Sequence, residues 1–174
     1  LRRDYQGVEV SYENQDPQGP GADVQRANLT AGFGSLSKQN FNAMLVVDWR
    51  RQENLQANER KFSETGIIGG EGGTSGTSFP GDAGGFEPSL PNCAPPNSIP
   101  NPAGTACRYD FTRDIDIIPT NEQLTTLAKV SVGLGGSHVI GAEYLRAENK
   151  ATAQVAAAPT SMFIPDTSPF FPAG

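Results

Sequence analysis

The side chains that could support catalysis are few in this chain, and they are poorly placed for it. The only histidine, His138, opens a predicted strand beside a glycine-rich turn. A catalytic histidine needs a nucleophile and an orienting carboxylate within hydrogen-bond reach, and the sequence offers no such set around His138. We therefore interpret His138 as a surface residue beside a turn, and we predict that the chain is not an enzyme.

Carboxylates and glycine runs also occur without the spacing of a known site. Asp110, Asp114 and Asp116 could offer oxygen ligands to calcium, but the ordered positions and central glycine of an EF-hand loop are missing. The glycine-rich residues 69–73 lack the spacing and the lysine of a phosphate-binding P-loop. We interpret the aspartates as solvated loop charges and the glycines as a flexible loop, and we predict no cofactor and no metal.

The two cysteines indicate a local cross-link. Cys93 and Cys107 bracket a proline-rich segment, and an even count at close spacing in a loop is typical of a disulfide in an oxidising compartment. In the chain-entropy model, closing a loop of this size stabilises the fold by about 3 kcal/mol. No nearby histidine or further cysteine completes a tetrahedral metal site. Two free thiols are the alternative.

Five segments alternate between apolar and polar side chains, which is the pattern of β-strands with two unlike faces. We expect the polar faces to carry charges of both signs that line a water-filled lumen; the solvated outer face of a soluble sheet is the alternative. The predicted strands cover residues 7–14, 24–33, 41–53, 123–133 and 138–150, and the candidate lumen-facing residues are Glu9, Glu13, Asp48, Arg50, Lys129 and Glu143.

The connections between these strands alternate in length. Residues 34–40 and 134–137 are short, whereas residues 54–122 form a loop rich in glycine and proline that exceeds ordinary loop lengths. Short turns at one end and long loops at the other predict an all-β, antiparallel up-and-down meander of about five strands. This meander would be one part of a transmembrane β-barrel with long extracellular loops. Aromatic residues toward the strand ends fit an interfacial girdle: Tyr12, Phe33, Phe41, Trp49 and Tyr144.

Composition narrows the classes of function. Only 36% of the residues are hydrophobic, which is few for a chain that must form its own hydrophobic core. The net charge is -6, and the chain lacks the basic patch that binding of nucleic acid requires. No apolar run is long enough for a transmembrane helix, and no signal peptide stands at the N-terminus. The start at Leu1 without methionine fits a piece of a longer exported precursor, and it also fits a trimmed soluble domain.

Short phrases of the sequence resemble the opening part of the barrel of a TonB-dependent outer-membrane receptor. Residues 2–9, from Arg2 to Glu9, resemble the junction at which the plug domain ends and the first barrel strand begins. The likeness spans essentially the whole chain but contains no catalytic signature. The other phrases are residues 31–34, 41–53, 107–111, 117–122, 142–145, 165 and 168–170.

The resemblance implies a barrel of about 22 strands in the bacterial outer membrane, filled by an N-terminal plug and energised by TonB. Such a receptor takes up a scarce nutrient, such as a ferric siderophore, a vitamin or an oligosaccharide. The expected partners are the remainder of the barrel and the plug, TonB through an N-terminal region, membrane lipid and the nutrient. This sequence contains no TonB box or plug, and five strands cannot close a barrel, so we expect a fragment of the transporter across residues 1–174.

Two other classes of protein stay open. The first is an extracellular structural or adhesive protein whose open sheet pairs edge to edge into a fibre. The second is a secreted carbohydrate-binding module or hydrolase, which is weaker because no pair of carboxylates stands out.

Overall fold

The computed structural model describes residues 4–83, 86–135 and 137–169, and the chain divides into two compact units. The first, which we call the sheet unit, comprises Leu1–Leu55 and Ile118–Ala153. The second, the loop unit, comprises Gln56–Ile117 and Gln154–Gly174. Each unit is described by itself.

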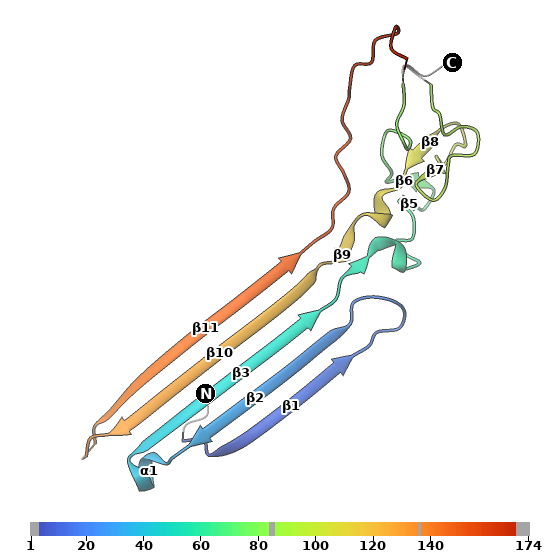
Figure 1. The fold of residues 1–174 in the computed structure, drawn as a ribbon. Coiled ribbons are helices and arrows are strands. Elements are labelled where there is room, and N and C mark those ends of the chain that lie inside the picture. Colours follow the sequence, from blue (N-terminus) through green and yellow to red (C-terminus); the bar gives the residue numbers. More distant parts are fainter. Residues whose placement is uncertain (1–3, 84–85, 136, 170–174) are drawn as a thin grey trace. The chain divides into compact units, whose positions relative to one another are not determined.

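The sheet unit contains five antiparallel strands in the order β1-β2-β3-β10-β11 (Figure 1). The predicted five-stranded meander is confirmed, and its predicted strand ends differ from the observed ones by at most three residues. The strands are β1 (Gly7–Gln15), β2 (Val24–Phe33), β3 (Phe41–Gln52), β10 (Thr120–Gly133) and β11 (Val139–Thr152).

The register aligns directly opposed residues in rows across all five strands. One row contains Val8, Ala31, Leu45, Ala128 and Tyr144. Because successive side chains of a strand point to opposite faces, every second residue from this row shares its face, which we call the apolar face. The residues between them form the polar face.

The β2–β3 connection is a compact turn that contains the single-turn helix α1 (Leu36–Gln39). Gly34 and Asn40 have φ values of 86° and 60°, in the left-handed region that glycine and asparagine adopt most readily. The Gly133 N–H donates to the Asn40 carbonyl at 2.7 Å, which joins this turn to the end of β10. The β10–β11 turn is closed by the Leu134 N–H, which donates to the carbonyl of the exposed His138 at 3.0 Å.

The loop unit is built from short elements. β7 (Ser98–Pro100) pairs with β8 (Cys107–Tyr109), and 3-10 turns occupy η1 (Ala57–Glu59) and η2 (Phe111–Arg113). β5 (Ile67–Ile68) and β6 (Glu71–Gly72) form a two-residue ladder within the glycine-rich segment, which the sequence predicted to be only a flexible loop. Such a ladder is too short to show alternation. Finally, β4 (Leu55–Gln56) pairs with β9 (Asp116–Ile118).

Few apolar side chains are buried in the described part of the chain. Only Met44 among them belongs to the five-stranded sheet. Within the described residues, the five-stranded sheet therefore buries one apolar side chain and not a core. The same residues include no helix that is both long and apolar enough to cross a membrane. The buried apolar residues are Met44, Leu55, Ala57, Cys93, Ala106 and Cys107.

Candidate functional site

The apolar face of the sheet is exposed over most of its area. Val8 and Val10 are 71% and 72% exposed, and Phe33 is 69% exposed. A contiguous apolar surface of this kind is unfavourable in water and is typical of surfaces that contact lipid or another protein. Its large exposed side chains are Val8, Val10, Tyr12, Phe33, Leu45, Leu124, Val130, Val132, Ile140 and Tyr144.

Aromatic side chains lie at both ends of this apolar surface. At the turn end, the rings of Phe33 and Phe41 are in contact, with centroids 5.7 Å apart. At the opposite end, Tyr12 and Trp49 lie in one register row, with Ala27 between them. The five aromatic residues of the predicted girdle thus share one face of the sheet and lie at the borders of its apolar band: Tyr12, Phe33, Phe41, Trp49 and Tyr144.

The apolar band runs obliquely across the register. Val8 and Tyr144 occupy the same row, yet Val8 begins the band on β1 and Tyr144 ends it on β11. Beyond Tyr144, the charged residues Arg146 and Glu148 take over this face of β11. On β1 the middle of the band is Val10, and the residue of β11 in the same row is Arg146. On β11, however, the middle of the band is Ala142, four residues before Arg146.

The polar face carries all six candidate lumen-facing residues. Lys129 and Glu143 are directly opposed and form an ion pair at 3.9 Å, and Asp48 pairs with Arg26. Glu13 and Arg50 lie in one row, on either side of Arg26. The register thus places Glu9, Glu13, Asp48, Arg50, Lys129 and Glu143 on one face, and their exposure to a lumen stays a prediction.

A polar cluster that the sequence did not indicate connects β2 to β3. The guanidinium of Arg26 donates from Nε and Nη2 to Oδ2 of Asp48 at 3.1 and 3.0 Å, and Asn28 donates to the same oxygen at 3.2 Å. Thr30 donates in turn to the Asn28 side chain at 3.2 Å. Arg26, Asn28 and Thr30 alternate along β2, and only the register reveals that Asp48 stands opposite Asn28.

Residues 4–6, which we call the strap, lie against the polar face at its turn end. Asn42 on β3 is buried, with only 7% of the residue exposed. The two hydrogens of its Nδ2 are shared among three carbonyls, those of Tyr5 at 3.0 Å, Phe33 at 3.3 Å and Gly34 at 2.8 Å. One amide group therefore joins the strap to the end of β2 and to the turn.

Two further contacts hold the strap in place. The Asp4 carboxylate accepts hydrogen bonds from the Leu36 N–H at 2.7 Å and from the Ser35 hydroxyl at 3.0 Å. A Cβ on Gly32 would lie 2.2 Å from the Tyr5 carbonyl oxygen, so only glycine allows this approach. Gly32 belongs to the polar face, because it is opposed to Met44 and Gly7 in the row next to Val8.

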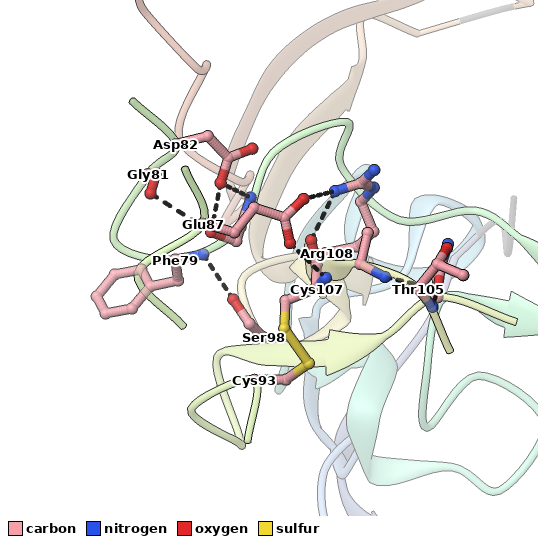
Figure 2. Close-up of a disulfide and its surroundings, with 12 residues drawn as sticks. Phe79, Gly81, Asp82, Glu87, Cys93, Ser98, Thr105, Cys107 and Arg108 are labelled. Carbon is pink, nitrogen blue, oxygen red and sulfur yellow. Dashed lines mark hydrogen bonds and ion pairs between the residues drawn. A yellow bond between two sulfur atoms is a disulfide. The ribbon is translucent and has the colours of Figure 1, made fainter. Parts of the chain in front are cut away.

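The predicted disulfide between Cys93 and Cys107 is present, and it is buried in the loop unit (Figure 2). Glu87 lies beside it. One carboxylate oxygen of Glu87 accepts the Cys107 N–H at 2.8 Å, and the other accepts Nη1 of Arg108 at 3.0 Å. The Ser98 hydroxyl accepts the Phe79 N–H at 2.6 Å. This bond joins the segment before Cys93 to the loop that the disulfide closes.

The interpretation of Asp110 as a solvated charge is wrong, because only 3% of this residue is exposed. Its carboxylate accepts hydrogen bonds from the Gly66 N–H and the Thr112 N–H, both at 3.1 Å, and from the Thr112 hydroxyl at 2.9 Å. These donors compensate the burial of the charge. Asp114 accepts the Tyr109 hydroxyl, and Asp116 accepts the Gln154 N–H at 2.7 Å.

Carboxylates also crowd together where β1 and β2 are connected. Asp23 is half-buried, and its pKa is raised by desolvation and by the nearby carboxylates of Asp16 and Glu53. The Glu53 N–H donates to the Asp23 carbonyl at 2.8 Å, which brings these two residues together. Within the described residues, no group of three or more histidine, cysteine or acidic side chains is arranged to hold a metal ion.

Comparison of the chain with models of known protein families, with curated proteins and with solved structures finds no match.

Proposed function

We propose that this chain is part of the wall of a transmembrane β-barrel in the bacterial outer membrane. The barrel belongs to a TonB-dependent receptor that takes up a scarce nutrient, such as a ferric siderophore, a vitamin or an oligosaccharide. The observation that carries the membrane assignment is the exposed, oblique apolar band of the sheet. The receptor assignment is supported by the likeness of the sequence phrases.

The slope of the band matches strands that cross a flat apolar layer at an angle. From β1 to β11 the middle of the band moves by four residues over four neighbouring strand pairs. With a rise of about 3.4 Å per residue and a strand spacing of about 4.8 Å, this shift corresponds to a tilt of about 35°. Strands of transmembrane barrels tilt by about 35 to 45°, whereas upright strands would give a level band.

The polar face then lines the lumen. The ion pairs Lys129–Glu143 and Arg26–Asp48 suit a wet interior, where charges cost little. The strap supports the same orientation, because the chain enters β1 across the polar face. In the proposed receptor this is the side of the plug. The turns at residues 34–40 and 134–138 are then periplasmic, and the loop unit is extracellular.

The single tryptophan provides a direct test of the lipid contact. Trp49 lies on the apolar face at the loop end of the band. In bilayers of brominated lipid, we expect the fluorescence of Trp49 to be quenched most strongly by bromine near the headgroups. In a Leu45→Trp, Trp49→Phe variant, bromine deeper in the acyl chains should quench best. Quenching of both tryptophans by aqueous acrylamide, with none by brominated lipid, would overturn the membrane assignment.

The receptor assignment is tested by uptake. Cells that express the complete protein should accumulate one labelled compound from a panel of ferric siderophores, cobalamin and maltodextrins, and removal of TonB should abolish that uptake. Uptake that persists without TonB would contradict an energised receptor.

Unpaired edges favour one competing function. β1 and β11 stand at the two ends of the strand order, and such edges can pair with further copies of a chain to form a fibre. Electron microscopy of the purified protein separates the cases. Detergent-solubilised particles of uniform size support the barrel, whereas fibres that grow without detergent support the adhesive alternative.

A further inference from the structure

We propose that the strap, residues 4–6, is a fixed anchor that fastens the chain entering β1 to the polar face. The inference rests on the proposed function in one respect, namely that a plug is joined to the barrel through this strap. During movement of the plug in transport, the strap then stays attached to the barrel wall.

The anchor contacts three separate parts of the wall. Asn42 on β3 holds the Tyr5 carbonyl, and the Asp4 carboxylate holds the Leu36 N–H and the Ser35 hydroxyl in the turn. The bonds to Asp4 involve a charged acceptor and are stronger than bonds between neutral groups. Gly32 on β2 supplies the space that the strap backbone occupies. Because these contacts are independent, thermal loss of one leaves the strap attached by the others.

The burial of Asn42 increases the cost of release. Its Nδ2 also donates to the carbonyls of Phe33 and Gly34, so the side chain is oriented by the β2–β3 turn whether or not the strap is bound. Release of the strap leaves the Tyr5 carbonyl without this donor and exposes a preformed site for it. Such preorganised sites favour rebinding, because little side-chain freedom is lost.

Hydrogen exchange of the full-length protein in detergent micelles tests the anchor. We expect the Leu36 amide, which donates to Asp4, to exchange at least about tenfold more slowly than an unprotected amide. Asn42→Ala should accelerate exchange in residues 4–7 by about tenfold, with β3 amides as the internal check on folding. Ser131→Ala is the matched control, because Ser131 stands directly opposite Asn42 on the same face. Asp4→Asn is a milder second variant that should accelerate Leu36.

A nitroxide at Gln6, introduced through Gln6→Cys, tests the location of movement. Gln6 is exposed, and its label should keep the same restricted spectrum when the periplasmic domain of TonB is added. A mobile spectrum on addition of TonB, or equal exchange in wild type and Asn42→Ala, would overturn the anchor. Neither hydrogen exchange nor the spectrum of the labelled Gln6→Cys protein depends on uptake, so the anchor can fail while the receptor assignment holds. Conversely, lipid quenching of Trp49 can fail while the anchor holds.

Discussion

Leu45 shows how one side chain reports on the environment of a whole face. It lies in the row of Val8 and Tyr144, near the middle of the apolar band. At mid-depth in a bilayer we expect Leu45→Arg to lower the free energy of unfolding by about 2–4 kcal/mol, measured by denaturant titration of the complete protein in lipid vesicles. The matched control is Leu127→Arg, because Leu127 lies one row away on the polar face.

The two arginine variants discriminate between lipid and water. In the proposed barrel, the Leu127→Arg side chain would face an aqueous lumen, so this variant should leave the free energy of unfolding nearly unchanged. Equal costs at positions 45 and 127 would place both faces in the same environment, which contradicts the proposed barrel.

Some contacts between residues could be predicted from the sequence, and others could not. The disulfide was predictable because the chain has two cysteines, close together in a proline-rich loop. The strap was not, because nothing in the sequence around Tyr5 indicates that Gly32 and Asn42 meet its carbonyl. Such contacts depend on the path of the chain outside the strands. The cluster around Asp48 depends on the register, which places Asn28 opposite it.

At the scale of elements, the connection between β1 and β2 should respond to pH through Asp23. The raised pKa of Asp23 means that the folded connection binds a proton more readily than the unfolded chain. The folded connection therefore gains stability as the pH falls through this raised pKa and loses it as the pH rises. At pH 7, Asp23→Asn should slow exchange of the Glu53 amide, which donates to the Asp23 carbonyl.

The difference between Asp23→Asn and wild type should vanish at a pH below the ordinary aspartate pKa, where both side chains are neutral. Comparison of the two proteins at the same pH removes the intrinsic pH dependence of exchange. Asp166→Asn, in an exposed part of the loop unit, is the control. A difference that persists in acid would assign the effect to packing and not to charge.

The disulfide should determine the stability of the loop unit. Replacing both Cys93 and Cys107 with serine should lower the stability of the segment by about 3 kcal/mol, which limited proteolysis followed by mass spectrometry measures as faster cleavage. Because both cysteines are buried, a reductant without denaturant should leave the mass unchanged. A gain of two hydrogens under native conditions would show that the bond is accessible.

The strands themselves were predictable because alternation is a local signal. β1, β2 and β3 alternate along almost their full length, so their predicted limits agree closely with those observed. β10 begins three residues earlier than predicted, at Thr120, because polar residues on both faces hide its start from a pattern of polarity. β5 and β6 have two residues each, which is too few for any period to appear.

At the scale of the whole molecule, the protection of the two edge strands from hydrogen exchange depends on whether the sheet is closed into a barrel. In the proposed barrel, β1 and β11 would each gain a neighbouring strand, so their amides should be as protected from exchange as those of β3. In the 174-residue chain alone, β1 and β11 should exchange faster than β3. Equal protection in the isolated chain would indicate that its edges pair with other copies.

The close spacing of the cystine has a consequence for biogenesis. Cys93 and Cys107 are only 14 positions apart, so the bond can form before any strand pairs with its neighbour. If the chain is part of the proposed receptor, the bond would form in the periplasm and the loop unit would cross the outer membrane already cross-linked. The machinery that inserts such a barrel would then have to open wide enough for a cross-linked loop to pass, and not only for an extended hairpin.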